Sequence, residues 1–249
     1  MEHRLVDPPL GEPNHARGLL YRSALRAVQE AEFRYATRQQ LLAGLDLAVI
    51  TGCPVCWEVS GRPATWGGNH LGETLEEAQA VVLFPGGLGT QDENFETLTL
   101  IQTGKAELVP VVLCDAPGGS YWTSWLEYVE KQLLAKGMIG KDDMNLFKIT
   151  DRAEDAVAEV VKFYRRYHSS RFVGDRFAIR LNSALSDETL STLNGEFSDI
   201  ITGGRFEQRP GPLEGEGDAY PQKPRLVFDF DRRSAGRLRL LINWLNDVP

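Results

Sequence analysis

Short apolar runs alternate with longer segments of helical periodicity through the first two thirds of the chain. The apolar runs are rich in β-branched residues, which is typical of strands buried on both faces of a parallel sheet. They predict strands at 45–51, 80–84, 108–114 and 146–150. Apolar residues at helical spacing predict helices at 19–43, 93–103, 121–136 and 153–167. Since strands that alternate with helices build parallel sheets, we expect an α/β fold with helices on both faces.

The pattern changes after Tyr167. Residues 176–181 alternate as in a strand and 187–201 resemble a capped helix. A loop rich in glycine, proline and glutamate covers 203–224, followed by a predicted strand at 226–230 and a predicted helix at 234–246. We therefore expect two parts: a main α/β domain over residues 1–167 and a small β-α-β-α, or α+β, appendage over 168–249.

A glycine turn directly follows the predicted strand at 80–84. In open parallel sheets, ligands bind beyond the carboxyl ends of the strands, where a glycine turn lets a phosphate approach the next helix. Glycine removes the side chains that would block that approach. The sequence therefore predicts phosphate binding by Gly86, Gly87, Leu88, Gly89 and Thr90.

Glu93 lies one turn into the following helix, so its carboxylate is expected to face the same pocket, near the group attached to the phosphate. A structural role is also open, because Thr90 and Glu93 have the spacing of a capping box. Asp92 and Glu96 are interpreted as solvated first-turn acids that offset the helix dipole.

The residues around this turn match every fixed position of PGGxGTxxE: Pro85, Gly86, Gly87, Gly89, Thr90 and Glu93. This is the signature of the LOG family, the cytokinin-activating nucleoside 5′-monophosphate phosphoribohydrolases once labelled lysine decarboxylases. The stretches FETLTLIQTGK (95–105) and PVVLCDAPGGSYW (110–122) also resemble the family. With the tail from Tyr167, the chain is similar to a bacterial branch with a C-terminal extension.

The resemblance implies a Rossmann-like fold, usually a dimer, and hydrolysis of a nucleoside monophosphate to free base and ribose 5-phosphate. Backbone N–H groups of the loop would hold the 5′-phosphate. Glu93 would stabilise an oxocarbenium-like ribose or position the attacking water. The resemblance implies that the reaction needs no metal or organic cofactor. It also implies a homodimer or higher oligomer.

The N-terminal third departs from the family pattern. VITGCPVCWE (49–58) resembles the family's second glycine loop with one position missing, and we predict ribose or base contacts from Gly52, Glu58 and Arg62. His70 stands where the family has the arginine that partners the glutamate, and it cannot supply a permanent bidentate charge. Two interpretations of Arg62 and Arg38 are open. Either one of them takes the place of the family arginine, or each is a surface residue.

Two other functions stay open on this evidence. Retention of the loop without the arginine suits a non-catalytic nucleotide or cofactor carrier, similar to molybdenum-cofactor carriers. Alternatively, a pseudo-enzyme subunit would pair with an active relative. A pyridoxal-phosphate decarboxylase has little support, because no lysine stands in a context that identifies a Schiff-base residue.

The composition of the chain limits the classes of partner that we expect it to bind. The net charge of −8 disfavours binding to nucleic acid or an anionic membrane. No apolar run is long enough to span a membrane and no signal peptide is evident, so we expect a cytoplasmic protein with reduced cysteines.

The C-terminal appendage is rich in arginine, and two interpretations are open. These arginines either contact phosphate or form a solvated basic face that balances the acidic loop 214–218: Arg171, Arg176, Arg180, Arg232, Arg233, Arg237 and Arg239.

Overall fold

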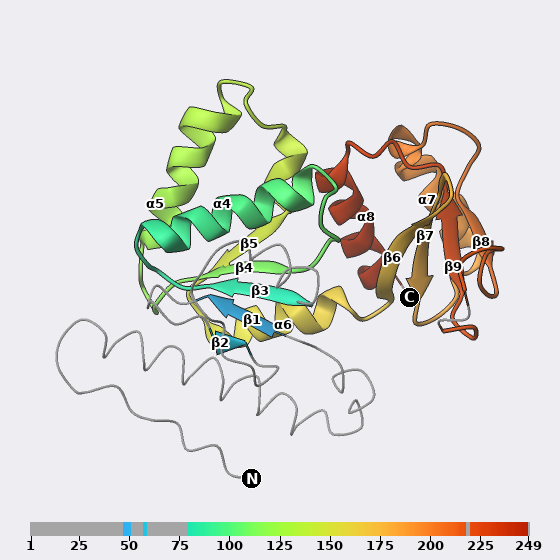
Figure 1. Ribbon diagram of the computed structural model, residues 1–249, viewed down its shortest axis with the longest axis horizontal. Coiled ribbons are helices and arrows are strands. Elements are labelled where there is room, and N and C mark those ends of the chain that lie inside the picture. The colour runs from blue at the N-terminus through green and yellow to red at the C-terminus, as the bar shows by residue number, and fades with distance from the viewer. Residues whose placement is uncertain (1–46, 51–56, 59–78, 218–219, 249) are drawn as a thin grey trace, which may run out of the picture.

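The computed structural model describes residues 47–50, 57–58, 79–217 and 220–248 (Figure 1). The predicted helix at 19–43 and the residues Gly52, Arg62, His70 and Arg38 lie outside the described residues, as do Cys53 and Cys56. None of the helices in the described part is long and apolar enough to cross a membrane.

The first sheet has five strands in the order β2-β1-β3-β4-β5. The strands are β1 (Leu47–Ile50), β2 (Trp57–Glu58), β3 (Ala80–Leu83), β4 (Val111–Cys114) and β5 (Phe147–Thr150). Four of them pair in parallel, and β2 joins the edge antiparallel to β1. The α/β prediction is confirmed, and the short strand β2 falls within the segment that resembles the family's second glycine loop.

Both faces of this sheet are covered, because β3 and β4 are buried along their whole length. Val81 and Leu83 share one apolar cluster with residues of α4 (Leu88–Gln102) and α5 (Tyr121–Tyr128). Val82 and Phe84 share the other with Ala156 of α6 (Ala153–Phe163). The alternation of side chains along each strand thus sends α4 and α5 to one face and α6 to the other.

The helices predicted at 121–136 and 153–167 differ from those observed. The helix predicted at 121–136 is α5 followed by a π-helical turn, η2 (Val129–Leu134). The helix predicted to reach Tyr167 ends at Phe163, because Tyr167 begins the next strand. A short 3₁₀ helix, η3 (Lys141–Asn145), leads into β5.

The second sheet is antiparallel with the order β6-β7-β9-β8. Its strands are β6 (Tyr167–Val173), β7 (Arg176–Leu181), β8 (Glu207–Arg209) and β9 (Arg225–Phe228). The helices are α7 (Asp187–Glu196), the 3₁₀ turn η4 (Ser198–Ile200) and α8 (Ala235–Asp247). Hence the expected β-α-β-α pattern is wrong in detail: it omits β6, and β8 lies inside the predicted loop.

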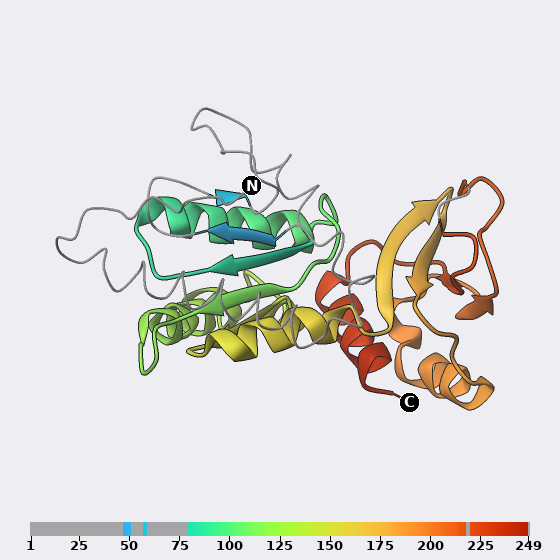
Figure 2. The same ribbon diagram turned by 90° about the horizontal axis from the view of Figure 1, so that it is seen from below.

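Helix α8 lies between the two sheets (Figures 1 and 2). It packs against η3, α6, α4 and β6. Gly236 lies so close to η3 that a Cβ atom would overlap the Asp142 carbonyl group. Because a single apolar cluster runs through both sheets, the division into 1–167 and 168–249 stays a prediction.

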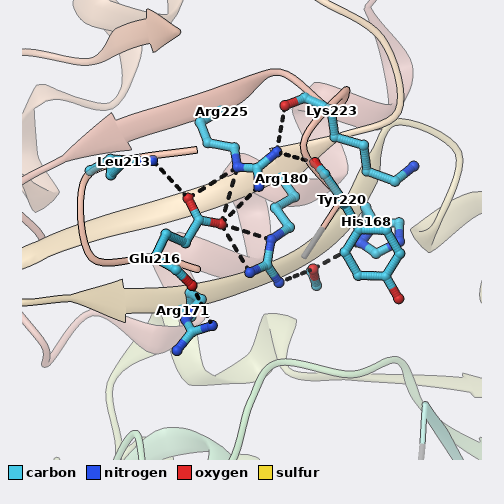
Figure 3. A network of polar contacts seen from close by, with 9 residues as sticks. His168, Arg171, Arg180, Leu213, Glu216, Tyr220, Lys223 and Arg225 are labelled. Atoms are coloured by element: carbon cyan, nitrogen blue, oxygen red, sulfur yellow. Dashed lines mark hydrogen bonds and ion pairs between the residues drawn. The ribbon is translucent and has the colours of Figure 1, made fainter. Parts of the chain in front are cut away.

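A buried ionic network ties the loop before β9 to the second sheet (Figure 3). Glu216, which is 4% exposed, accepts hydrogen bonds from Arg180, Arg225 and the Leu213 N–H. Arg180 and Arg225 are themselves buried. The basic-face interpretation is therefore wrong for Arg180, and also for Arg239, which is buried and paired with Glu159.

We predict that Glu216→Gln lowers the free energy of unfolding by about 3–5 kcal/mol, because two buried guanidinium groups lose their counter-charge. Urea denaturation measures this loss. The control is Glu127→Gln, which removes an exposed ion pair with Lys131 and is expected to change stability by less than ~0.5 kcal/mol. Equal effects of the two substitutions would contradict the assigned role.

A second prediction concerns His168, which contacts the Tyr220 ring at 4.4 Å between ring centroids. Burial, with Lys223, Arg180 and Arg225 nearby, lowers the pKa of His168 from 6.5 to about 4. As the pH falls from 6.5 towards 4, the His168 imidazole therefore binds a proton in the unfolded chain but stays neutral in the folded chain. Stability should fall over this window, and denaturation of His168→Gln should show a smaller fall. An unchanged pH dependence would contradict this account.

Candidate functional site

The predicted phosphate-binding residues lie at the carboxyl end of β3, where α4 begins. Pro85, Gly86 and Gly87 form the turn, and Leu88 is the first helical residue, five positions earlier than the predicted helix start. The Gln91 N–H donates to the Gly87 carbonyl at 3.2 Å. The N–H groups before it, those of Leu88, Gly89 and Thr90, have no acceptor within the helix.

The helix start excludes the capping-box interpretation of Thr90 and Glu93. Gly87 is the N-cap and has no side chain to cap the helix, whereas Thr90 is the third helical residue. Asp92 and Glu96 are exposed, as predicted, but they lie beyond the first turn, which contains no acid. The positive end of the helix dipole is therefore not offset by a first-turn carboxylate, and it favours an anion.

Among the described residues, none comes close to the glycines at this helix end. A Cβ atom on Gly87 or Gly89 would meet nothing within 4 Å. Gly87 has φ of −93°, which any residue can adopt. Neither packing nor backbone conformation within the described structure requires glycine at these two positions. Both glycines fit the predicted close approach of a phosphate to the backbone.

Glu93 follows Gly89 by four residues, so the two lie on the same side of α4. Helical side chains lean toward the N-terminus, which directs the half-buried Glu93 side chain over Gly89. Gly89 itself has no side chain to separate Glu93 from the helix end. From this spacing we expect the Glu93 carboxylate about one turn behind the predicted phosphate position.

The buried face of α4 is unusually polar next to this site. Thr90, Asn94 and Thr97 are almost fully buried, and only Ile101 on this face is apolar. Within the described part of the chain, the side-chain amide of Asn94 and the hydroxyl of Thr97 have no hydrogen-bond partner. A buried polar group without a partner costs about 1–3 kcal/mol, and the described residues offer Asn94 and Thr97 no compensating hydrogen bond. They make the buried face of α4 polar next to this site.

The other predicted contacts, from Glu58, Gly52 and Arg62, stay predictions. Glu58 lies in β2, where its backbone pairs with Ala48 of β1. Gly52 and Arg62 lie outside the described residues. The sequence analysis missed Gln91 and Tyr121, which hydrogen-bond to each other next to the turn. The sequence signal for Tyr121 is the YW pair at the start of α5, which belongs to a stretch that resembles the family.

Metal and thiol chemistry find no support in the residues that can be described. They contain no cluster of three or more His, Cys, Asp or Glu side chains suited to a metal ion. Cys114 is a free, buried cysteine at the end of β4. Burial and the nearby carboxylates of Asp115 and Asp151 raise the pKa of its thiol to about 11, so it is protonated and unreactive near neutral pH.

The fold and the turn define an α/β protein with a glycine loop at the carboxyl edge of a parallel sheet. Residues 72–160, about a third of the chain, match the family model described as possible lysine decarboxylase. This match is consistent with the resemblance to LOG proteins. No curated protein matches the chain.

We predict that Gly89→Ala weakens binding of inorganic phosphate at least about tenfold, because its methyl group enters the approach to the helix end. The fold should gain roughly 0.5–1 kcal/mol, since alanine suits a helix better than glycine. Calorimetric titration and thermal unfolding measure the two effects.

Gly195→Ala on α7 is the matched control. A Cβ atom there also meets nothing within 4 Å, so the fold should gain stability without any change in phosphate affinity. Unchanged phosphate binding by Gly89→Ala would contradict the site.

Proposed function

We propose that this chain hydrolyses the N-glycosidic bond of a nucleoside 5′-monophosphate. The observation that carries the proposal is the complete PGGxGTxxE pattern on a helix start that has no first-turn acid. Among the described residues, nothing approaches Gly87 or Gly89 where a ligand would bind. The match of residues 72–160 to the family supports it.

In this proposal the 5′-phosphate lies at the N-terminus of α4. Leu88, Gly89 and Thr90 donate their N–H groups, and the helix dipole adds to the attraction. The Thr90 hydroxyl supplies a further donor. Because the attraction comes from backbone dipoles, a chain with a net charge of −8 can still bind an anion locally.

Glu93 faces the ribose in this arrangement. The C1′–N bond breaks with its electron pair moving to the base, while positive charge grows on the ribose ring. A carboxylate stabilises that charge more in the transition state than in the substrate, which accelerates the reaction. Water then bonds to C1′, and the proton it loses balances the proton gained by the departing base. The products are free base and ribose 5-phosphate.

A decarboxylase reaction, the one named by the family description, is a poorer fit to these residues. A pyridoxal-phosphate enzyme holds its cofactor through a lysine Schiff base. Neither the turn nor α4 contains a lysine. The resemblance also supports a homodimer or higher oligomer as the working assembly.

Glu93→Gln tests the hydrolase. We expect base release from a panel of nucleoside monophosphates to fall about 10²-fold or more, with nucleotide affinity little changed. Glu96→Gln, an exposed acid on the same helix, should release base at the wild-type rate. Chromatography of the released base gives the rates.

If wild-type protein binds nucleotide but releases no base, the hydrolase proposal fails and a carrier or a pseudo-enzyme subunit remains. If Glu93→Gln retains full activity, another residue stabilises the ribose.

A further inference from the structure

We propose that Tyr121 is a positioning residue that orients the Gly86–Gly87 peptide toward the phosphate. The inference rests on the phosphate site of the proposed function but does not require hydrolysis. The Tyr121 hydroxyl donates to the Gly86 carbonyl at 2.9 Å and accepts from Gln91 Nε2 at 2.5 Å. Its single proton and a lone pair are thus both used, which fixes the hydroxyl between the turn and the helix.

The bond to Gly86 determines where the next N–H group points. In a trans peptide the C=O and N–H groups point in opposite directions. No described peptide bond is cis, so holding the Gly86 carbonyl toward α5 turns the Gly87 N–H away from α5. A peptide between two glycines has little steric resistance to rotation. Tyr121 therefore selects the orientation in which Gly87 adds a donor beside those of Leu88, Gly89 and Thr90.

Tyr121 can hold the turn because its own backbone is firmly placed. It is the first residue of α5, and the N-terminal ends of α4 and α5 lie side by side (Figure 1). The buried Asp115 carboxylate accepts from the Trp122 N–H at 3.0 Å and from the Ala116 N–H at 3.1 Å. Gly119 passes so close that a Cβ atom would overlap the Asp115 carboxylate.

The same loop is also attached to β5. The Gly118 N–H donates to Asp151 Oδ2 at 2.9 Å, and Gly118 has φ of +72°, a conformation that favours glycine. Trp122 is fully buried next to Tyr121. The ends of β4 and β5 thus position Tyr121, and Tyr121 positions the turn after β3.

Tyr121→Phe tests the inference, because it removes only the hydroxyl. We expect inorganic phosphate and adenosine 5′-monophosphate to bind about 3- to 10-fold more weakly, the range for a lost hydrogen bond. Binding of adenosine, which lacks the phosphate, should not change. If the protein hydrolyses nucleotide, KM should rise while kcat stays within about twofold, as for uniform binding.

Tyr128→Phe, an exposed tyrosine of the same helix, is the matched control and should bind as the wild type does. Gln91→Met removes the bond to the Tyr121 hydroxyl but leaves the bond to Gly86, so it should weaken phosphate binding in the same direction and by less. This variant serves if Tyr121→Phe does not fold.

Wild-type phosphate affinity in Tyr121→Phe, or equal weakening of adenosine and its monophosphate, would overturn the positioning role. Absence of phosphate binding by the wild type would overturn it as well. Nucleotide binding without turnover would instead reject only the hydrolase, and the role of Tyr121 would stand.

Discussion

The hydrogen-bonding requirement of the first turn of α4 is the constraint on which the rest of the site depends. Every helix leaves its first N–H groups without intrahelical acceptors, and most helices meet this need with a capping side chain or water. Here the N-cap is Gly87, which has no side chain, and the first turn has no acid. Because β3 is a buried parallel strand, the uncapped end lies at the carboxyl edge of the sheet. The proposed phosphate ligand would complete the helix.

The remainder of the chain holds that edge in place. Asp115 fixes the start of α5, whose first residue contacts the turn, so neighbouring strand ends are linked through backbone hydrogen bonds. On the opposite side, α8 returns from the second sheet and packs against α4 and α6. The network around Glu216 keeps the second sheet and its loop together. These contacts give the glycine turn a rigid frame although the turn itself has few side chains.

Among the described residues, the buried polar side chains of α4 and of the second sheet differ in their partners. The buried face of α4 contains Asn94 and Thr97, whose side chains lack partners among the described residues, although an apolar face would pack better against the sheet. The tail arginines show the opposite case. Arg180 and Arg239 are buried, but each has a carboxylate partner, so their burial serves the fold. This difference directs attention to α4 as the functional element and to the second sheet as structural support.

The sequence by itself determined β3, the glycine turn and the helical character of α4, because these depend on apolar runs and on glycine, which act over a few residues. The spacing of one motif also predicted the family resemblance that the match of residues 72–160 supports. Only the tertiary structure decided that α4 begins at Leu88, which excludes the capping box. It likewise decided that β6 and β8 are strands, since polar edge strands form only where a neighbouring strand supplies hydrogen bonds. The contact of Tyr121 with Gly86 joins residues 35 apart, a distance that no local pattern encodes.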